Sequence, residues 1–140
     1  MTTDVVIKHR PSFSTLEVEL SPGQSIVAES DAMASMSSNV DIATRFNGGI
    51  FTAIMRKLFG GESLFINEFR IDGRDNGSVV LTQPTPGDIE MVELQNTSLY
   101  LQPGAFVACD PSIDLSLGWA GLASLVGGEG LFRLRVSGQG

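Results

Sequence analysis

Few residues in this sequence have side chains suited to catalysis. Its single histidine, His9, lies beside Arg10 and Pro11, and a nucleophilic mechanism of the Ser-His-Asp or Cys-His kind needs a histidine that can shuttle a proton. The single cysteine, Cys109, follows the apolar run 106–108 and precedes Asp110, whereas basic neighbours favour a reactive thiolate. We predict that Cys109 is structural and that the chain has no catalytic triad.

Metal binding and carboxylate chemistry are the remaining options. One histidine cannot supply the two or three that transition-metal sites in small β-barrels use, and the acidic turn at 72–77 lacks the alternating carboxylates and distal Glu of a calcium loop. Glu62 and Glu129 both follow a Gly-Gly pair, so a carboxylate pair for hydrolysis remains an alternative, although such a glutamate equally caps backbone amides. We predict a non-enzymatic protein with no cofactor and no metal.

The composition is typical of one soluble globular domain. The chain has 140 residues, 42% of them apolar, and 16 acidic against 9 basic groups, for a net charge of −7. A chain of this length buries roughly two thirds of its unfolded surface and needs no disulfide. Its acidity argues against nucleic-acid binding. It shows neither a secretory signal nor an apolar run of about 20 residues, so we predict a cytoplasmic protein.

Alternating patterns predict mostly antiparallel strands. Apolar and charged residues alternate over 16–20 and 132–136, and the stretch 64–71 begins apolar on both faces and ends one-sided, as in a strand leaving a sandwich core. Pro-Gly at 22–23, 86–87 and 103–104 predicts type II turns, and Asn-Gly at 76–77 predicts a type I′ hairpin. Turns at this spacing indicate an all-β sandwich or roll.

One segment, 49–59, has helical rather than strand periodicity. Its apolar residues recur at helical spacing and are followed by Gly-Gly at 60–61, which can end a helix in the left-handed conformation. We predict one short helix here, with a stripe formed by Ile50, Phe51, Ile54, Met55 and Leu58.

Two sets of motifs recur in order. Leu-Ser-Pro-Gly at 20–23 with Val-Ala at 27–28 returns as Leu-Gln-Pro-Gly at 101–104 with Val-Ala at 107–108, and Gly-Gly-Glu-Ser-Leu-Phe at 60–65 returns as Gly-Gly-Glu-Gly-Leu-Phe at 127–132. They predict two related modules, about 13–75 and 95–140, with the helix inserted in the first. Packed about a pseudo-twofold axis, they would form a double-stranded β-helix or jelly-roll-like sandwich within one domain, 1–140.

Two apolar segments precede the two Gly-Gly-Glu motifs: the predicted helix and the stretch 117–126. They either cover the open ends of the roll or form a subunit interface. Arg45, Arg56 and Lys57 would suit a membrane surface, which the net acidity opposes. The candidate interface residues are Ile50, Phe51, Ile54, Met55, Leu58, Trp119 and Leu122.

A family resemblance rests on several motifs in order. They are Leu-Glu-Val-Glu-Leu-Ser-Pro-Gly at 16–23, Val-Ala-Glu at 27–29, Met-Ala-Ser-Met at 33–36, 60–67, Pro-Gly-Asp-Ile at 86–89, 104–108 and 128–132. Together they resemble the altered-inheritance-of-mitochondria family numbered twenty-four, over nearly the whole chain. The resemblance implies a fold like that of the trp RNA-binding attenuation protein (TRAP-like). Bacterial and archaeal members have no assigned activity, and the mitochondrial relative is associated with inner-membrane organisation. Members usually continue past Gly140 with further strands, so we expect a shortened member or a part of one.

We therefore expect a protein of unknown biochemical activity that acts as a non-catalytic homo-oligomeric scaffold or assembly protein, with contact at a membrane surface as a further role. The alternative is a β-roll that binds a small molecule in its interior. RNA binding by analogy of fold ranks last because the net charge opposes it.

Overall fold

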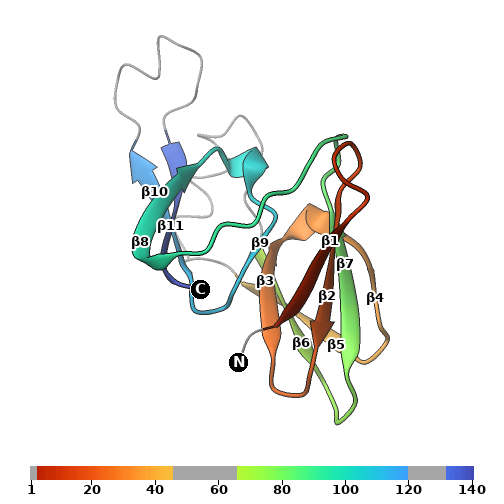
Figure 1. The fold of residues 1–140 in the computed structure, drawn as a ribbon. Helices are drawn as coiled ribbons and strands as arrows, with labels where there is room; N and C mark the ends of the chain where they lie inside the picture. The colour runs from red at the N-terminus through yellow and green to blue at the C-terminus, as the bar shows by residue number, and fades with distance from the viewer. Residues whose placement is uncertain (1–2, 46–65, 120–131) are drawn as a thin grey trace.

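The computed structural model describes residues 3–45, 66–119 and 132–140, which form strands in three antiparallel sheets (Figure 1). The strands are β1 (Asp4–Lys8), β2 (Thr15–Leu20), β3 (Ser25–Glu29), β4 (Met33–Met36), β5 (Val40–Arg45), β6 (Ile66–Ile71), β7 (Gly77–Thr82), β8 (Gln95–Leu101), β9 (Ala108–Cys109), β10 (Asp114–Trp119) and β11 (Phe132–Gln139). Two short 3-10 helices, η1 (Ser30–Ala32) and η2 (Pro103–Ala105), follow β3 and β8. The all-β prediction is confirmed, and the alternating segments 16–20 and 132–136 lie in β2 and β11.

Two four-stranded sheets, in the orders β1-β2-β7-β4 and β5-β6-β3-β9, enclose the main core. Every second residue of β2 and β7 is buried, because successive side chains on a strand point to opposite faces. Phe69 of β6 is fully buried in this core. The buried members of the main core are Leu16, Val18, Leu20, Ile26, Ala28, Ala32, Val40, Phe69, Val79, Leu81 and Ile89.

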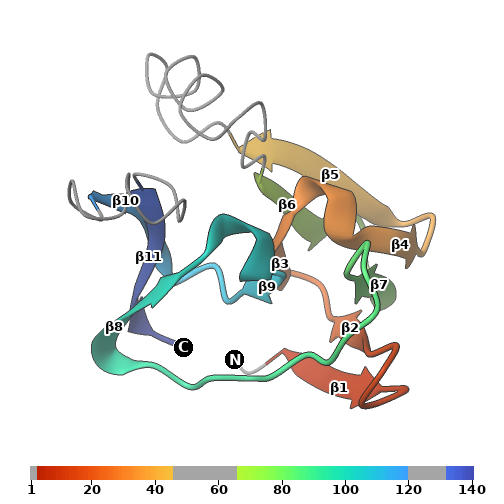
Figure 2. The same ribbon diagram turned by 90° about the horizontal axis from the view of Figure 1, so that it is seen from above.

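The third sheet, in the order β10-β11-β8, stands beside this sandwich (Figure 2). Among the described residues its core is small: Leu94, Phe106, Leu134 and Val136 are buried, with half-buried leucines of β8 and β10 around them. The connection 83–94 crosses from β7 to β8 along one side of the molecule.

The short strand β9 joins the two parts. Although it follows β8 along the chain, it pairs antiparallel with β3 of the sandwich, where Ala108 lies opposite Ala28 and Cys109 opposite Val27. The Glu29 backbone N–H also donates to the Val107 carbonyl, at 2.9 Å. The third sheet is therefore held to the sandwich by main-chain hydrogen bonds as well as by the connection.

The turn predictions were right at one position and wrong at three. Gly23 has a φ of 85° and the Gln24 N–H bonds to the Ser21 carbonyl, as in a type II turn. Gly87 instead forms a parallel bridge with Phe13, and Gly104 lies within η2.

The predicted type I′ turn at Asn76-Gly77 is also displaced. Gly77 begins β7, and its Cα packs so closely against Asn39 that a Cβ would lie 2.8 Å from the amide oxygen. The turn occupies 72–76 and has its positive φ at Gly73. Packing against a neighbouring loop thus decided which residues made the turn.

The predicted helix at 49–59 and the apolar stretch 120–126 lie outside the described residues. Within the described ranges, no helix has the length and apolar character needed to cross a membrane.

Candidate functional site

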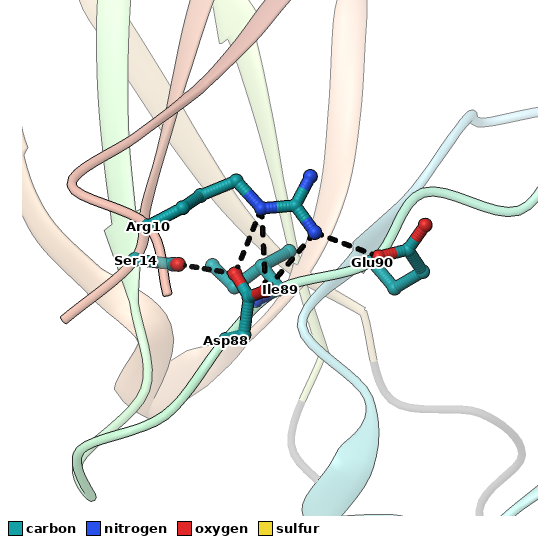
Figure 3. Close-up of polar contacts among 5 residues, drawn as sticks. All are labelled: Arg10, Ser14, Asp88, Ile89 and Glu90. Carbon is teal, nitrogen blue, oxygen red and sulfur yellow. Dashed lines mark hydrogen bonds and ion pairs between the residues drawn. The ribbon is translucent and has the colours of Figure 1, made fainter. Parts of the chain in front are cut away.

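A cluster of charged side chains lies where the loop after β1 meets the connection between β7 and β8 (Figure 3). Arg10 Nε donates to both carboxylate oxygens of Asp88, at 3.0 and 3.2 Å, and its Nη2 donates to Asp88 Oδ2 at 3.0 Å. The same Nη2 donates to Glu90 Oε2 at 2.8 Å. The Ser14 hydroxyl and the Ile89 backbone N–H also donate to Asp88 Oδ1, at 2.5 and 2.9 Å. We call these residues the Arg10–Asp88 cluster.

Backbone contacts hold the two segments in place for this cluster. The Ser14 N–H donates to the Gly87 carbonyl at 3.1 Å, and the Gly87 N–H donates to the Ser12 carbonyl at 2.7 Å. Phe13 therefore runs parallel to Gly87 as an isolated bridge. The cluster thereby holds the connection 83–94 against the loop between β1 and β2.

The electrostatics of the cluster keep Asp88 ionised. Hydrogen bonds from the Arg10 guanidinium, and then from the Ser14 hydroxyl, lower the pKa of the Asp88 carboxyl from 3.8 to about 2. The hydrogen bond to Asp88, and then the one to Glu90, raise the pKa of Arg10. A carboxylate with such a low pKa is a poor proton acceptor at neutral pH, since a general base works best with a pKa near the working pH. The arrangement suits anchoring rather than proton transfer.

The sequence reasoning did not find this cluster. Arg10 and Asp88 are separated by 78 positions, and the charged residues near each of them do not indicate that the two segments meet. The Pro-Gly-Asp turn at 86–88 was the one available signal, and it indicated a turn but no partner.

The residues considered for chemistry are dispersed. His9 is exposed, with a φ of 58°, just before the cis Arg10–Pro11 bond. Cys109 is half buried against the small core. Glu62 and Glu129 lie outside the described residues. The described part of the chain contains no group of three His, Cys, Asp or Glu side chains that could hold a metal.

Within the acidic stretch 72–77, residues 72–76 are exposed and Gly77 is buried at the start of β7. The turn is held through its backbone carbonyls. The Asn39 side-chain amide donates to the carbonyls of Asp75 and Asn76, both at 3.1 Å. Those carbonyls are therefore already used within the fold, as expected for a structural turn.

The candidate interface lies almost entirely outside the described residues. This applies to Ile50, Phe51, Ile54, Met55, Leu58 and Leu122. Trp119 is the last residue of β10, where it pairs with Phe132 of β11. The interface prediction at these positions stays a prediction.

The edges of the three sheets offer a different candidate interface. Among the described strands, β1, β5 and β10 lie at edges and carry charged residues, which discourage pairing with a further strand. β9 also lies at an edge but has only two residues. The edge strands β4 and β8 contain no charged residue and no proline. Each also presents a large exposed apolar side chain, Met36 on β4 and Tyr100 on β8.

Comparisons with known proteins agree with the fold. The chain is 32% identical over 136 residues to an uncharacterized protein of Streptococcus pyogenes serotype M6, a match that covers 91% of this chain and 54% of that protein. It superposes on the crystal structure of a Streptococcus pyogenes protein with a TM-score of 0.74 and 30% identity, covering 99% of this chain and 62% of the other. The chain thus spans little more than half the length of these relatives. The family model described as mitochondrial biogenesis AIM24 matches residues 5–140, so the chain belongs to the AIM24 family.

Proposed function

We propose that this chain is a non-catalytic assembly protein that associates with copies of itself through the edges of its β-sheets. The observation that carries this proposal is the open edge of β8. This strand has seven residues, and in the described part of the chain its one strand partner is β11. A strand edge presents a row of backbone N–H and C=O groups that can pair with another chain, and monomeric proteins usually block long edges with charges, prolines or bulges. β8 has no charge and no proline, and its irregularity lies at Asn96, at the end of the strand away from residues 99–101.

The side chains of β8 support an interaction with protein rather than with solvent. Its sequence is Gln-Asn-Thr-Ser-Leu-Tyr-Leu, and Tyr100 is 55% exposed on the face opposite the half-buried Leu99 and Leu101. Tyrosine is enriched in protein interfaces because its ring supplies apolar area while its hydroxyl tolerates water.

The charge of the chain favours a protein partner over an anionic lipid surface. A net charge of −7 would be repelled by acidic headgroups. We therefore propose a protein partner rather than a membrane surface.

The mass of the protein in solution tests this function. Light scattering coupled to size exclusion, over a concentration series and with and without anionic vesicles, should show a discrete oligomer that is unaffected by lipid. A mass of one chain, 14.9 kDa, at all concentrations would refute self-association. Binding to vesicles by a monomer would instead favour a membrane-surface role.

A further inference from the structure

Two stretches of the chain share the same order of elements at nearly the same spacing. The series β3, η1, β4, β5 and the series β8, η2, β9, β10 follow one another in the same way. The matching positions differ by 73, as between Ser25 and Ser98 (98 minus 25), and the 3-10 helices begin at Ser30 and Pro103 with the same difference. This correspondence differs from the one that the Pro-Gly motifs predict.

The strand pairing supports this correspondence. Arg70 of β6 lies opposite Ser25 of β3 and Asp41 of β5. In the third sheet, Ser137 of β11 lies opposite Ser98 of β8 and Asp114 of β10. The sheet β10-β11-β8 therefore repeats the arrangement β5-β6-β3 in register, because each partner of the central strand is displaced by the same 73 positions.

The correspondence also assigns counterparts to the contact that joins the two parts. In that contact Cys109 of β9 pairs with Val27 of β3, and Ala108 pairs with Ala28. The counterparts of Ala108 and Cys109 are Ser35 and Met36 of β4, at the same spacing of 73.

On the receiving strand, Val27 and Ala28 of β3 correspond to Tyr100 and Leu101 of β8. Within the chain, β9, the counterpart of β4, thus pairs with the edge of β3, the counterpart of β8.

Both counterpart edges lack a second strand partner in the described part of the chain, since β4 pairs with β7 and β8 pairs with β11. The exposed fractions of the side chains differ between the paired edge of β3 and the unpaired edge of β8. Val27, whose strand is covered by β9, is 4% exposed, whereas its counterpart Tyr100 is 55% exposed. Met36 is 38% exposed.

We propose that β4 of one copy of this chain pairs antiparallel with β8 of a second copy, in the register that β9 uses on β3. This inference rests on the self-association proposed above and names its contact. Met36 then lies opposite Tyr100, Ser35 lies opposite Leu101, and the Gln102 N–H donates to the Ala34 carbonyl as Glu29 donates to Val107. The two exposed side chains cover one another. Because the two surfaces differ, the contact is heterologous and builds a ring or an open chain of copies.

Cysteine cross-linking tests the register directly. Residues opposite each other in an antiparallel pair have Cα atoms about 4.5–5.5 Å apart, which is within reach of a disulfide. In a Cys109→Ala background, Met36→Cys mixed with Tyr100→Cys should give covalent dimers under mild oxidation, and neither variant alone should do so. A chain carrying both substitutions should give longer covalent oligomers.

A matched control uses another exposed edge position. Val6 on β1 is 47% exposed, so Val6→Cys mixed with Tyr100→Cys reports random collisions between accessible thiols. Cross-linking of Met36→Cys with Tyr100→Cys should exceed this background at least tenfold in initial rate.

The outcomes separate the two proposals. An oligomer that cross-links no faster than the control would overturn the β4–β8 contact and leave self-association standing. A monomer without specific cross-links would overturn both, and would leave the β8 edge to a further module of a longer chain.

Discussion

The two cores of the molecule should respond differently to the same truncation, Leu→Ala. Leu81 lies in the main core with ten other buried residues and is 0% exposed, and Leu134 lies in the small core with three described buried residues and is 1% exposed. Removing three carbons from either side chain costs about 2.4 kcal/mol in transfer free energy, at about 0.8 kcal/mol per buried carbon.

The cavity left behind adds to this cost, and its size depends on how far the surroundings collapse. Leu81 lies between the two sheets of the sandwich, on β7, which is paired with both β2 and β4, so we expect Leu81→Ala to lower the free energy of unfolding by about 3–5 kcal/mol. The small core has fewer partners and relaxes more easily, so Leu134→Ala should cost about 2–3 kcal/mol.

Urea unfolding followed by two probes measures both values. Far-ultraviolet circular dichroism reports all strands, whereas the fluorescence of Trp119, the single tryptophan, reports the end of β10. In Leu134→Ala the fluorescence transition should precede the dichroism transition, and in Leu81→Ala the two should coincide. An equal or larger cost at Leu134, with coincident transitions, would refute a separate small core.

Three further predictions concern the cluster, the β4 edge and one turn. The pKa of Asp88 is about 2 in the folded protein, against an ordinary value of 3.8, so the stabilisation from its pair with Arg10 should be complete above about pH 4 and lost as the pH falls towards 2. The difference in urea midpoint between the wild type and Asp88→Asn should therefore shrink over that pH range. A difference that stays constant with pH would contradict this prediction. Ala34→Pro should reduce the mass of the oligomer, because a proline on an edge strand blocks pairing with a further strand. Its melting temperature should stay within a few degrees of the wild-type value, because position 34 lies at the register shift of β4. Ala34→Ser is the control, and an unchanged mass in Ala34→Pro would count against the β4 edge. Gly77→Ala should lower the free energy of unfolding by about 1–3 kcal/mol, as expected for overpacking, because its Cβ would lie 2.8 Å from the side chains of Asn39 and Ile71. Thermal melts measure this change. Wild-type stability in the variant would show that these side chains move aside without cost.

Much of the fold was predictable because strand patterning is local. The alternation over 16–20 and 132–136 places every second residue on one face whatever the neighbouring strand, and β2 and β11 form there with Leu16, Val18, Leu20, Leu134 and Val136 buried. The turn at Gly23 was predictable for the same reason, since a Pro-Gly pair has its own torsional preference. Gly77 and Gly87 were not predictable, because Gly77 packs against Asn39 and Gly87 bonds to Ser12 and Ser14, which are far away in the sequence.

The candidate sites were less predictable. The Arg10–Asp88 cluster joins two loops that are far apart in the sequence. The chain has 16 acidic residues, so the sequence does not indicate which carboxylate pairs with Arg10. The β4 and β8 edges carried no motif at all. They were identified only from the sheet order, which shows the described strands that have no second neighbour within the described part of the chain.

By itself, the sequence determined the all-β class, the net negative charge, the two ordered sets of repeated motifs and the family to which the chain belongs. These follow from side-chain chemistry and from periodicity over a few residues. The tertiary structure alone decided which strands pair, that β9 crosses to β3, that Arg10 meets Asp88, and which edges have no partner among the described strands. The physical reason is that every strand presents the same backbone donors and acceptors, so pairing depends on how the whole chain packs rather than on any one segment.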